Sequence, residues 1–102
     1  MIFRIKNNKK PNDIQVILFG FGLKWNSGST KLQGISNMFE FFVVNFGGDH
    51  QHDIYKKWIL NELSFACLPF DSVSNLDELD LDNVEDLEQI KLMVEANKMN
   101  LL

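Results

Sequence analysis

One short segment gathers the side-chain types that bind metal ions, and it reads Asp49-His50-Gln51-His52-Asp53. On an extended chain, side chains two residues apart point to the same side, so His50 and His52 can approach one ion together. Imidazole and carboxylate ligands suit zinc or manganese, and Asp53 could complete such a site. The alternative interpretation is a solvated loop in which Asp53 caps a following helix. The segment supports one hypothesis, a small metal-dependent or nucleic-acid-acting enzyme.

A second group of chemically active side chains is an acidic tract in the C-terminal part of the chain. Between residues 71 and 88 there are eight carboxylates and no lysine or arginine. They are Asp71, Asp77, Glu78, Asp80, Asp82, Glu85, Asp86 and Glu88. A row of carboxylates spaced like phosphates can occupy the basic groove of a nucleic-acid-binding protein. The alternative is that these residues form only the solvated face of helices.

Calcium binding is a third interpretation of the same tract. The carboxylates are densest at Asp77, Glu78, Asp80 and Asp82. The EF-hand pattern is missing, because no glycine stands at the turn position. We therefore expect no bound metal and no cofactor.

The charge is divided unevenly between the two parts of the chain. Residues 1–60 carry a net charge of +4 and residues 61–102 a net charge of −8. Such a division is an argument about partners. We expect a non-enzymatic protein that binds a protein with a basic surface, such as a nuclease or another nucleic-acid-binding factor. Charge reversal at Asp77, Glu78, Asp80 and Asp82 should then abolish binding and leave the fold intact.

The chain has one cysteine, Cys67, between Ala66 and Leu68, and no internal disulfide can form. Cys67 is predicted to pack as a small hydrophobic residue, because no electropositive setting would activate it. We expect a cytoplasmic protein, since a single cysteine fits a reducing compartment. No apolar run approaches the about 20 residues of a membrane span, and lysines interrupt any signal-like segment near the N-terminus.

The apolar run from Phe39 to Phe46 is the segment around which the rest of the chain is predicted to fold. Its aromatic and β-branched residues favour a strand, which Gly47 and Gly48 would end. Alternation places large apolar side chains on both faces. This pattern indicates a central strand that is covered on one side and partly on the other.

Residues 13–21 are predicted to form a helix. Apolar residues follow helical spacing, Asn12 or Asp13 can cap the start, and Gly22 fits the left-handed position after the end. The alternative is a strand, because the β-branched residues of 14–18 also alternate and Gly20 disfavours a helix.

Two further helices are predicted. Residues 53–64 carry an amphipathic stripe. Residues 83–98 follow a capping box in which Asp82 is the cap and Glu85 its partner.

Short strands are predicted near residues 1–6, at 23–25 and at 31–35, the last two paired with each other. Residues 65–70 should be extended, and their apolar side chains offer a surface for a possible homo-oligomer. The fold class is therefore α+β: one domain over 1–102, a small mainly antiparallel sheet around 39–46 packed by two or three helices, and an acidic helical region at 71–102.

The segment 20–28 resembles two known sequence patterns. Gly20-Phe21-Gly22-Leu23-Lys24-Trp25 has the aromatic and glycine residues of an RNA-recognition submotif. Residues 1–7 could supply the partner submotif, but the gap between the two is too short to hold the helix that must separate them. The overall charge is also acidic, so direct nucleic-acid binding is not expected.

The stretch Gly22-Leu23-Lys24-Trp25-Asn26-Ser27-Gly28, after a strand and a helix, resembles a segment of small accessory proteins of tailed bacteriophages. In those proteins an aromatic residue usually stands where this chain has Leu23. The resemblance covers the first third of the chain and implies a compact domain used in host takeover or defence evasion. It carries no catalytic residues across.

Overall fold

The computed structural model describes residues 1–35, 40–48 and 60–101. These residues form a five-stranded mixed sheet and three helices, which confirms the predicted α+β class. In chain order the elements are β1 (Ile2–Ile5), α1 (Pro11–Gly20), β2 (Lys24–Trp25), β3 (Glu40–Asn45), β4 (Ser64–Pro69), α2 (Phe70–Val73), β5 (Glu78–Leu79) and α3 (Val84–Lys98). Within the described ranges, no helix has both the length and the apolar character needed to span a membrane.

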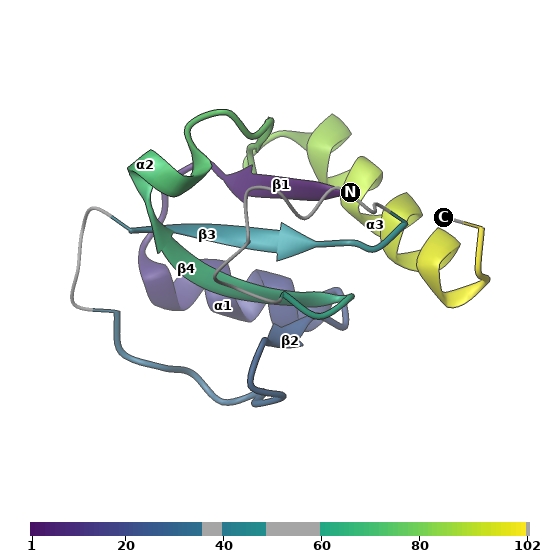
Figure 1. Cartoon of the computed structure of the whole chain (residues 1–102), viewed down its shortest axis with the longest axis horizontal. Coiled ribbons are helices and arrows are strands. Elements are labelled where there is room, and N and C mark those ends of the chain that lie inside the picture. The colour runs from purple at the N-terminus through teal and green to yellow at the C-terminus, as the bar shows by residue number, and fades with distance from the viewer. Residues whose placement is uncertain (36–39, 49–59, 102) are drawn as a thin grey trace.

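The strands are ordered β2-β4-β3-β1-β5, and Figure 1 shows β3 between β4 and β1. β3 pairs antiparallel with both of these neighbours, with β4 over the whole range from Glu40↔Pro69 to Asn45↔Ser64. The two outer strands are short and run parallel to their neighbours, β5 beside β1 and β2 beside β4. The long pairings are therefore antiparallel, as predicted.

β3 divides the apolar core into two clusters, one on each face of the sheet. Phe42 and Val44 belong to the larger cluster, and Val43 belongs to the smaller one. The strand is followed by Gly47 and Gly48, whose φ angles of 87° and 75° are readily adopted only by glycine. The predicted central strand is confirmed over 40–45, and apolar side chains cover both of its faces. Phe39, its predicted first residue, lies outside the described residues.

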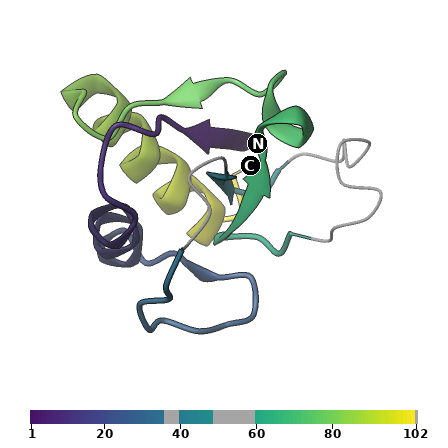
Figure 2. The same cartoon turned by 90° about the vertical axis from the view of Figure 1, so that its left-hand side faces the viewer.

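Helices α1 and α3 both cover the same face of the sheet, as Figure 2 shows. Their apolar side chains pack against the strands in the larger core cluster. Its buried members are Ile5, Ile14, Leu18, Leu23, Trp25, Phe42, Val44, Phe46, Phe65, Leu79, Leu81, Ile90, Met93 and Val94. The opposite face carries α2, and its Val73 packs with the smaller cluster. Removal of this apolar surface from water is the main force that holds the layers together.

The helix predicted at 13–21 is confirmed as α1, and the strand alternative for this segment is wrong. The helix begins earlier than predicted, at Pro11. Proline suits the first turn, because its missing N–H would have no helical partner there. The chain leaves the helix through Phe21, and Gly22 has the left-handed φ of 88° that was predicted for the residue after the end.

α3 confirms the helix predicted at 83–98, but the predicted cap is wrong. The N-cap is Asn83, whose Oδ1 accepts hydrogen bonds from the backbone amides of Glu85 at 2.8 Å and Asp86 at 3.2 Å. Asp82 lies one residue too early and forms an ion pair with Lys9. Asparagine and aspartate are equally good caps, so residue type did not distinguish these two neighbours.

Two other predictions fail. Residues 31–35 form no strand, and β2 pairs with β4 instead. The helix predicted at 53–64 does not reach its expected end, because the amide of Leu63 donates to Asn45 and Ser64 already begins β4. The first part of that helix, residues 53–59, lies outside the described residues.

The segment predicted to be extended at 65–70 is confirmed through Pro69 as β4, and α2 begins at Phe70. Phe65 and Leu68 are buried in the two core clusters, so they are not available as an oligomer surface. Among the large apolar side chains of this segment, only Phe70 is exposed.

Candidate functional site: an acidic rim and a pocket flanked by lysines

The eight carboxylates predicted to contact a partner follow one edge of the molecule. They lie on α2, β5, the first turns of α3 and the turns between these elements. Figures 1 and 2 both show this stretch of chain passing along the outer side of β1. We call the set the acidic rim. It consists of Asp71, Asp77, Glu78, Asp80, Asp82, Glu85, Asp86 and Glu88.

Three carboxylates of the rim are paired with cations of the N-terminal segment. The nitrogen–oxygen distances are 3.2 Å for Arg4–Glu78, 3.8 Å for Lys6–Asp80 and 2.5 Å for Lys9–Asp82. Parallel pairing of β5 with β1 brings these opposite charges together. Eight carboxylates and three cations leave a net charge of −5 along the rim.

Arg4 attaches the start of the acidic rim to the sheet. Its Nη1 donates to the backbone oxygens of Val73 at 3.1 Å and Ser74 at 3.0 Å, and its Nε donates to Glu78. The guanidinium carbon lies 5.6 Å from the centre of the Phe70 ring, within cation–π range. Glu78 therefore has a structural partner. The expectation that its charge can be reversed without effect on the fold is not supported.

Asp80 organises the turn between β5 and α3. Its Oδ1 accepts from the backbone amide of Asp82 at 2.8 Å and from Nδ2 of Asn8 at 3.0 Å. These donors favour the ionised form, the amide of Asp82 most strongly, so they hold the pKa of Asp80 below its usual value. Asp86 accepts a hydrogen bond from the backbone amide of Asp80 at 2.8 Å. The side chains of Asp80 and Asp86 thus stabilise the fold itself.

Lys9 closes the same turn from the N-terminal side. A hydrogen bond with Asp82 is the largest influence on its ammonium group and raises the pKa of Lys9. An ion pair between exposed side chains adds little to stability because water screens it, so this contact positions the turn more than it stabilises the fold.

Four members of the acidic rim have no such internal role. Asp71, Asp77, Glu85 and Glu88 are exposed. Within the described part of the chain, their carboxylates form no ion pair and accept no hydrogen bond. They are the members of the predicted contact set that are free to meet a partner.

The two metal hypotheses have different outcomes. His50, His52 and Asp53 lie outside the described residues, so the structure places none of them. Among the residues that are described, no three histidine, cysteine or acidic side chains are placed to hold one metal ion. The acidic side chains of residues 77–82 are therefore not gathered into a calcium site.

Cys67 lies on β4, half-buried beside the larger core cluster. Burial raises the pKa of its thiol to about 12, and the negative charge of Glu40 adds to the effect. A thiol with so high a pKa is a poor nucleophile at neutral pH. The structure therefore agrees with the prediction of an unreactive cysteine.

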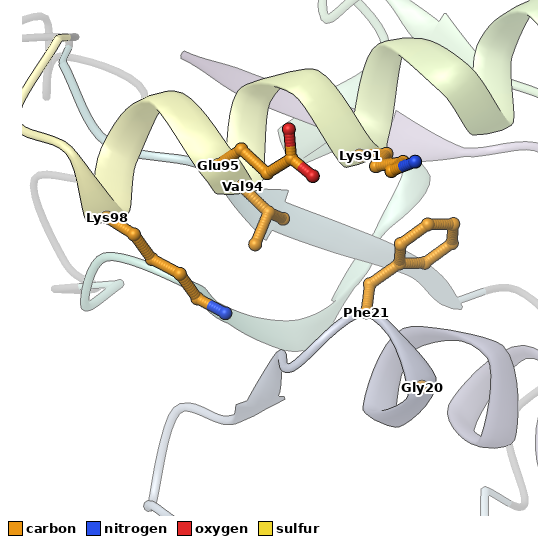
Figure 3. A pocket seen from close by; sticks show the side chains of 6 residues that line it. All are labelled: Gly20, Phe21, Lys91, Val94, Glu95 and Lys98. Carbon is orange, nitrogen blue, oxygen red and sulfur yellow. The ribbon is translucent and has the colours of Figure 1, made fainter.

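A pocket lies between the C-terminal end of α1 and the second half of α3. It has a volume of about 310 Å³ and is lined by Gly20, Phe21, Lys91, Val94, Glu95 and Lys98. Figure 3 shows the side chain of Val94 between those of Lys98 and Phe21, with Lys91 beside the ring of Phe21. Val94 is almost fully buried, whereas both lysines are exposed. The pocket thus has an apolar floor and two positive charges at its margin.

This pocket was not predicted from the sequence. Its one sequence signal was the spacing of Lys91 and Lys98, which are seven residues apart and so lie on one side of a helix. The other half of the pocket comes from the end of α1, about 70 residues away along the chain. Such a distant partner leaves no local pattern.

Comparison of the chain with protein-family models, curated proteins and solved structures found no match.

Proposed function

We propose that the protein is a non-enzymatic inhibitor or modulator that binds another protein through its acidic rim. The partner we propose is a host protein with a basic surface, such as a nuclease or another nucleic-acid-binding factor. By the resemblance at residues 22–28, we further propose a phage-encoded protein that acts in host takeover or defence evasion. It would then act in the cytoplasm of the bacterial host.

The observation that carries this proposal is the excess of carboxylates along one edge of the molecule. After the three internal ion pairs are taken into account, the rim has a net charge of −5. Asp77 and Glu88 stand on either side of the paired carboxylates, so free charge lies at both ends of the turn. A basic groove that binds phosphates by charge would also attract this edge.

An apolar contact is available beside the free carboxylates. Val84, the first residue of α3, is 79% exposed, and it precedes Glu85 directly. Interfaces commonly surround an apolar contact with polar groups. We therefore place the centre of the proposed interface at the start of α3.

The test uses free carboxylates, so that a loss of binding does not reflect a loss of fold. We would immobilise the wild-type protein and the Asp77→Lys/Glu88→Lys variant and expose both to a bacterial lysate. Captured proteins are identified by mass spectrometry. The wild type should capture a nucleic-acid-binding protein that added double-stranded DNA displaces, and the variant should capture at least about tenfold less of it.

The matched control reverses two exposed carboxylates that are not members of the rim, in the variant Asp13→Lys/Glu95→Lys. It has the same net charge as the test variant and should capture the partner as well as the wild type does. Circular dichroism confirms that both variants are folded. Equal capture by the rim variant, or capture that DNA does not disturb, would contradict the proposal.

A further inference from the structure

The pocket between α1 and α3 combines a positive margin with an apolar floor. Lys91 and Lys98 are seven residues apart on α3, which separates their Cα atoms by about 10.5 Å along the helix axis. Within the described residues, neither lysine is part of an ion pair. Their charges are therefore available to a ligand in the pocket.

The two lysines are held at opposite ends of the pocket. Lys98 extends toward the end of α1, where its Nζ would lie 3.7 Å from a Cβ built on Gly22. Lys91 lies at the other end, beside the ring of Phe21, as Figure 3 shows. Phe21 and Val94 form the apolar part of the lining.

The lining determines what kind of molecule fits. The face of an aromatic ring and a valine favour a flat, apolar body, and Phe21 can stack on another ring. Two lysines and one glutamate leave a net charge of +1 at the margin. Glu95 lies between the lysines in sequence and would repel a second negative charge on the ligand. A volume of about 310 Å³ suits a small ligand.

We propose that this pocket binds a small organic monoanion with an aromatic body, of the class of aromatic carboxylates and sulfonates. The anionic group pairs with Lys91 or Lys98 at the margin, and the ring lies on Phe21 and Val94. This site lies between the end of α1 and the second half of α3, whereas the proposed interface is at the first turns of α3. The two proposals can therefore fail independently.

The probe is 2-naphthoate, and its neutral amide, 2-naphthamide, is the matched control ligand. Binding is measured by isothermal titration calorimetry and by shifts of backbone amide resonances in NMR spectra. We expect saturable binding of 2-naphthoate with a Kd of about 1 mM or below, and affinity at least about fivefold weaker for the amide. The shifted resonances should include Gly20, Phe21 and residues 91–98.

Two variants test the two parts of the pocket. Lys91→Gln/Lys98→Gln removes the charges and should weaken 2-naphthoate binding by about tenfold while leaving the amide unaffected. Gly20→Leu adds a side chain to the lining of the pocket and should weaken binding of both ligands. The backbone can accept a side chain there, because a Cβ at Gly20 meets no atom within 4 Å.

The control variant Lys10→Gln/Lys31→Gln removes two exposed lysines that do not line the pocket, and it should bind 2-naphthoate like the wild type. Equal affinity of the wild type for both ligands would overturn the proposal, because the lysines would then contribute nothing. Unchanged binding in the folded Gly20→Leu variant, or no saturable binding by the wild type, would overturn it as well.

Discussion

The indole Nε1 of Trp25 donates a hydrogen bond to Oε1 of Gln15 at 3.2 Å, in the interior of the protein. Gln15 is fully buried, and its remaining hydrogen bonds reach other parts of the chain. Its Oε1 also accepts from the amide of Gln33 at 2.8 Å, and its Nε2 donates to the backbone oxygens of Gln33 at 2.8 Å and Pro11 at 3.3 Å. One side chain thus joins α1, β2 and the segment after β2.

Replacement of Gln15 by leucine should destabilise the protein by about 2 kcal/mol. The new side chain has a similar size, but the indole N–H of Trp25 loses its partner in the core, and an unpaired buried donor is costly. Urea denaturation measures the loss, and faster hydrogen exchange at Gln33 would show that the segment after β2 has loosened.

The control for this prediction is Gln89→Leu, at an exposed position of α3. It should change stability by no more than about 0.5 kcal/mol. If Gln15→Leu has an equally small effect, the buried network does not stabilise the fold.

The sequence was a good guide to the elements whose signals are local. The apolar run of β3, the glycine after α1 and the acidic first turn of α3 each lie within one element. The burial of Gln15 was not predicted, because a glutamine on a helix is normally exposed and its partners lie 10 and 18 residues away.

The contacts within the acidic rim also could not be predicted from local sequence patterns. The sequence revealed an excess of carboxylates, but it could not reveal that Arg4 and Glu78, 74 residues apart, would lie side by side. Their contact depends on the parallel pairing of β1 with β5, and β5 has two residues. Such short elements, like α2, depend on tertiary contacts rather than on intrinsic propensity. Some of the positive charges of the N-terminal half and the negative charges of the C-terminal half therefore pair with each other within the fold.

The cap of α3 can be identified by a pair of substitutions. Asn83→Ala should destabilise the protein by about 1 kcal/mol, because it removes the side-chain acceptor of two backbone amides. Asp82→Ala removes an exposed ion pair with Lys9 and an exposed hydrogen bond from Asn8, but no cap, so it should cost clearly less than Asn83→Ala. Thermal or urea unfolding of both variants measures the difference. A larger loss of stability in Asp82→Ala than in Asn83→Ala would show that Asp82 is the N-cap, as predicted from the sequence.

Asp80 should make the stability depend on pH in the acidic range. Its pKa is lower in the folded protein than in the unfolded chain, so its contribution is present above the unfolded pKa of about 3.9. The contribution is lost as the pH falls through the lower, folded pKa. Asp80→Asn should therefore be less stable than the wild type at neutral pH, and the gap should narrow below about pH 4.

The measurement for Asp80 is urea unfolding at a series of pH values. Asp71→Asn is the matched control, since its carboxylate forms no hydrogen bond or ion pair in the described part of the chain. Its stability should follow the wild-type curve. A constant gap between Asp80→Asn and the wild type down to strongly acidic pH would show that ionisation of Asp80 is not responsible.

Two neighbouring glycines should respond to alanine in opposite directions. Gly20 ends α1 with free space around its Cα, so Gly20→Ala should stabilise the protein by about 0.5 kcal/mol through helix propensity and a less flexible unfolded chain. Gly22 has a φ of 88°, so Gly22→Ala should destabilise it by about 1 kcal/mol. Thermal unfolding of the two variants measures the change in stability for each. Changes in the same direction would contradict the described end of α1.

Cys67 should react slowly with thiol reagents while the protein is folded. Burial raises the pKa of the thiol to about 12, with a smaller contribution from the negative charge of Glu40. Little thiolate therefore exists at neutral pH. With a chromogenic disulfide reagent at about pH 8, we expect the native protein to react at least about a hundredfold more slowly than the protein in urea. Glu40→Gln should increase the native rate modestly, because it removes a charge that opposes ionisation while most of the burial is retained. Similar rates in the native and unfolded protein would mean that the thiol of Cys67 is accessible and readily ionised.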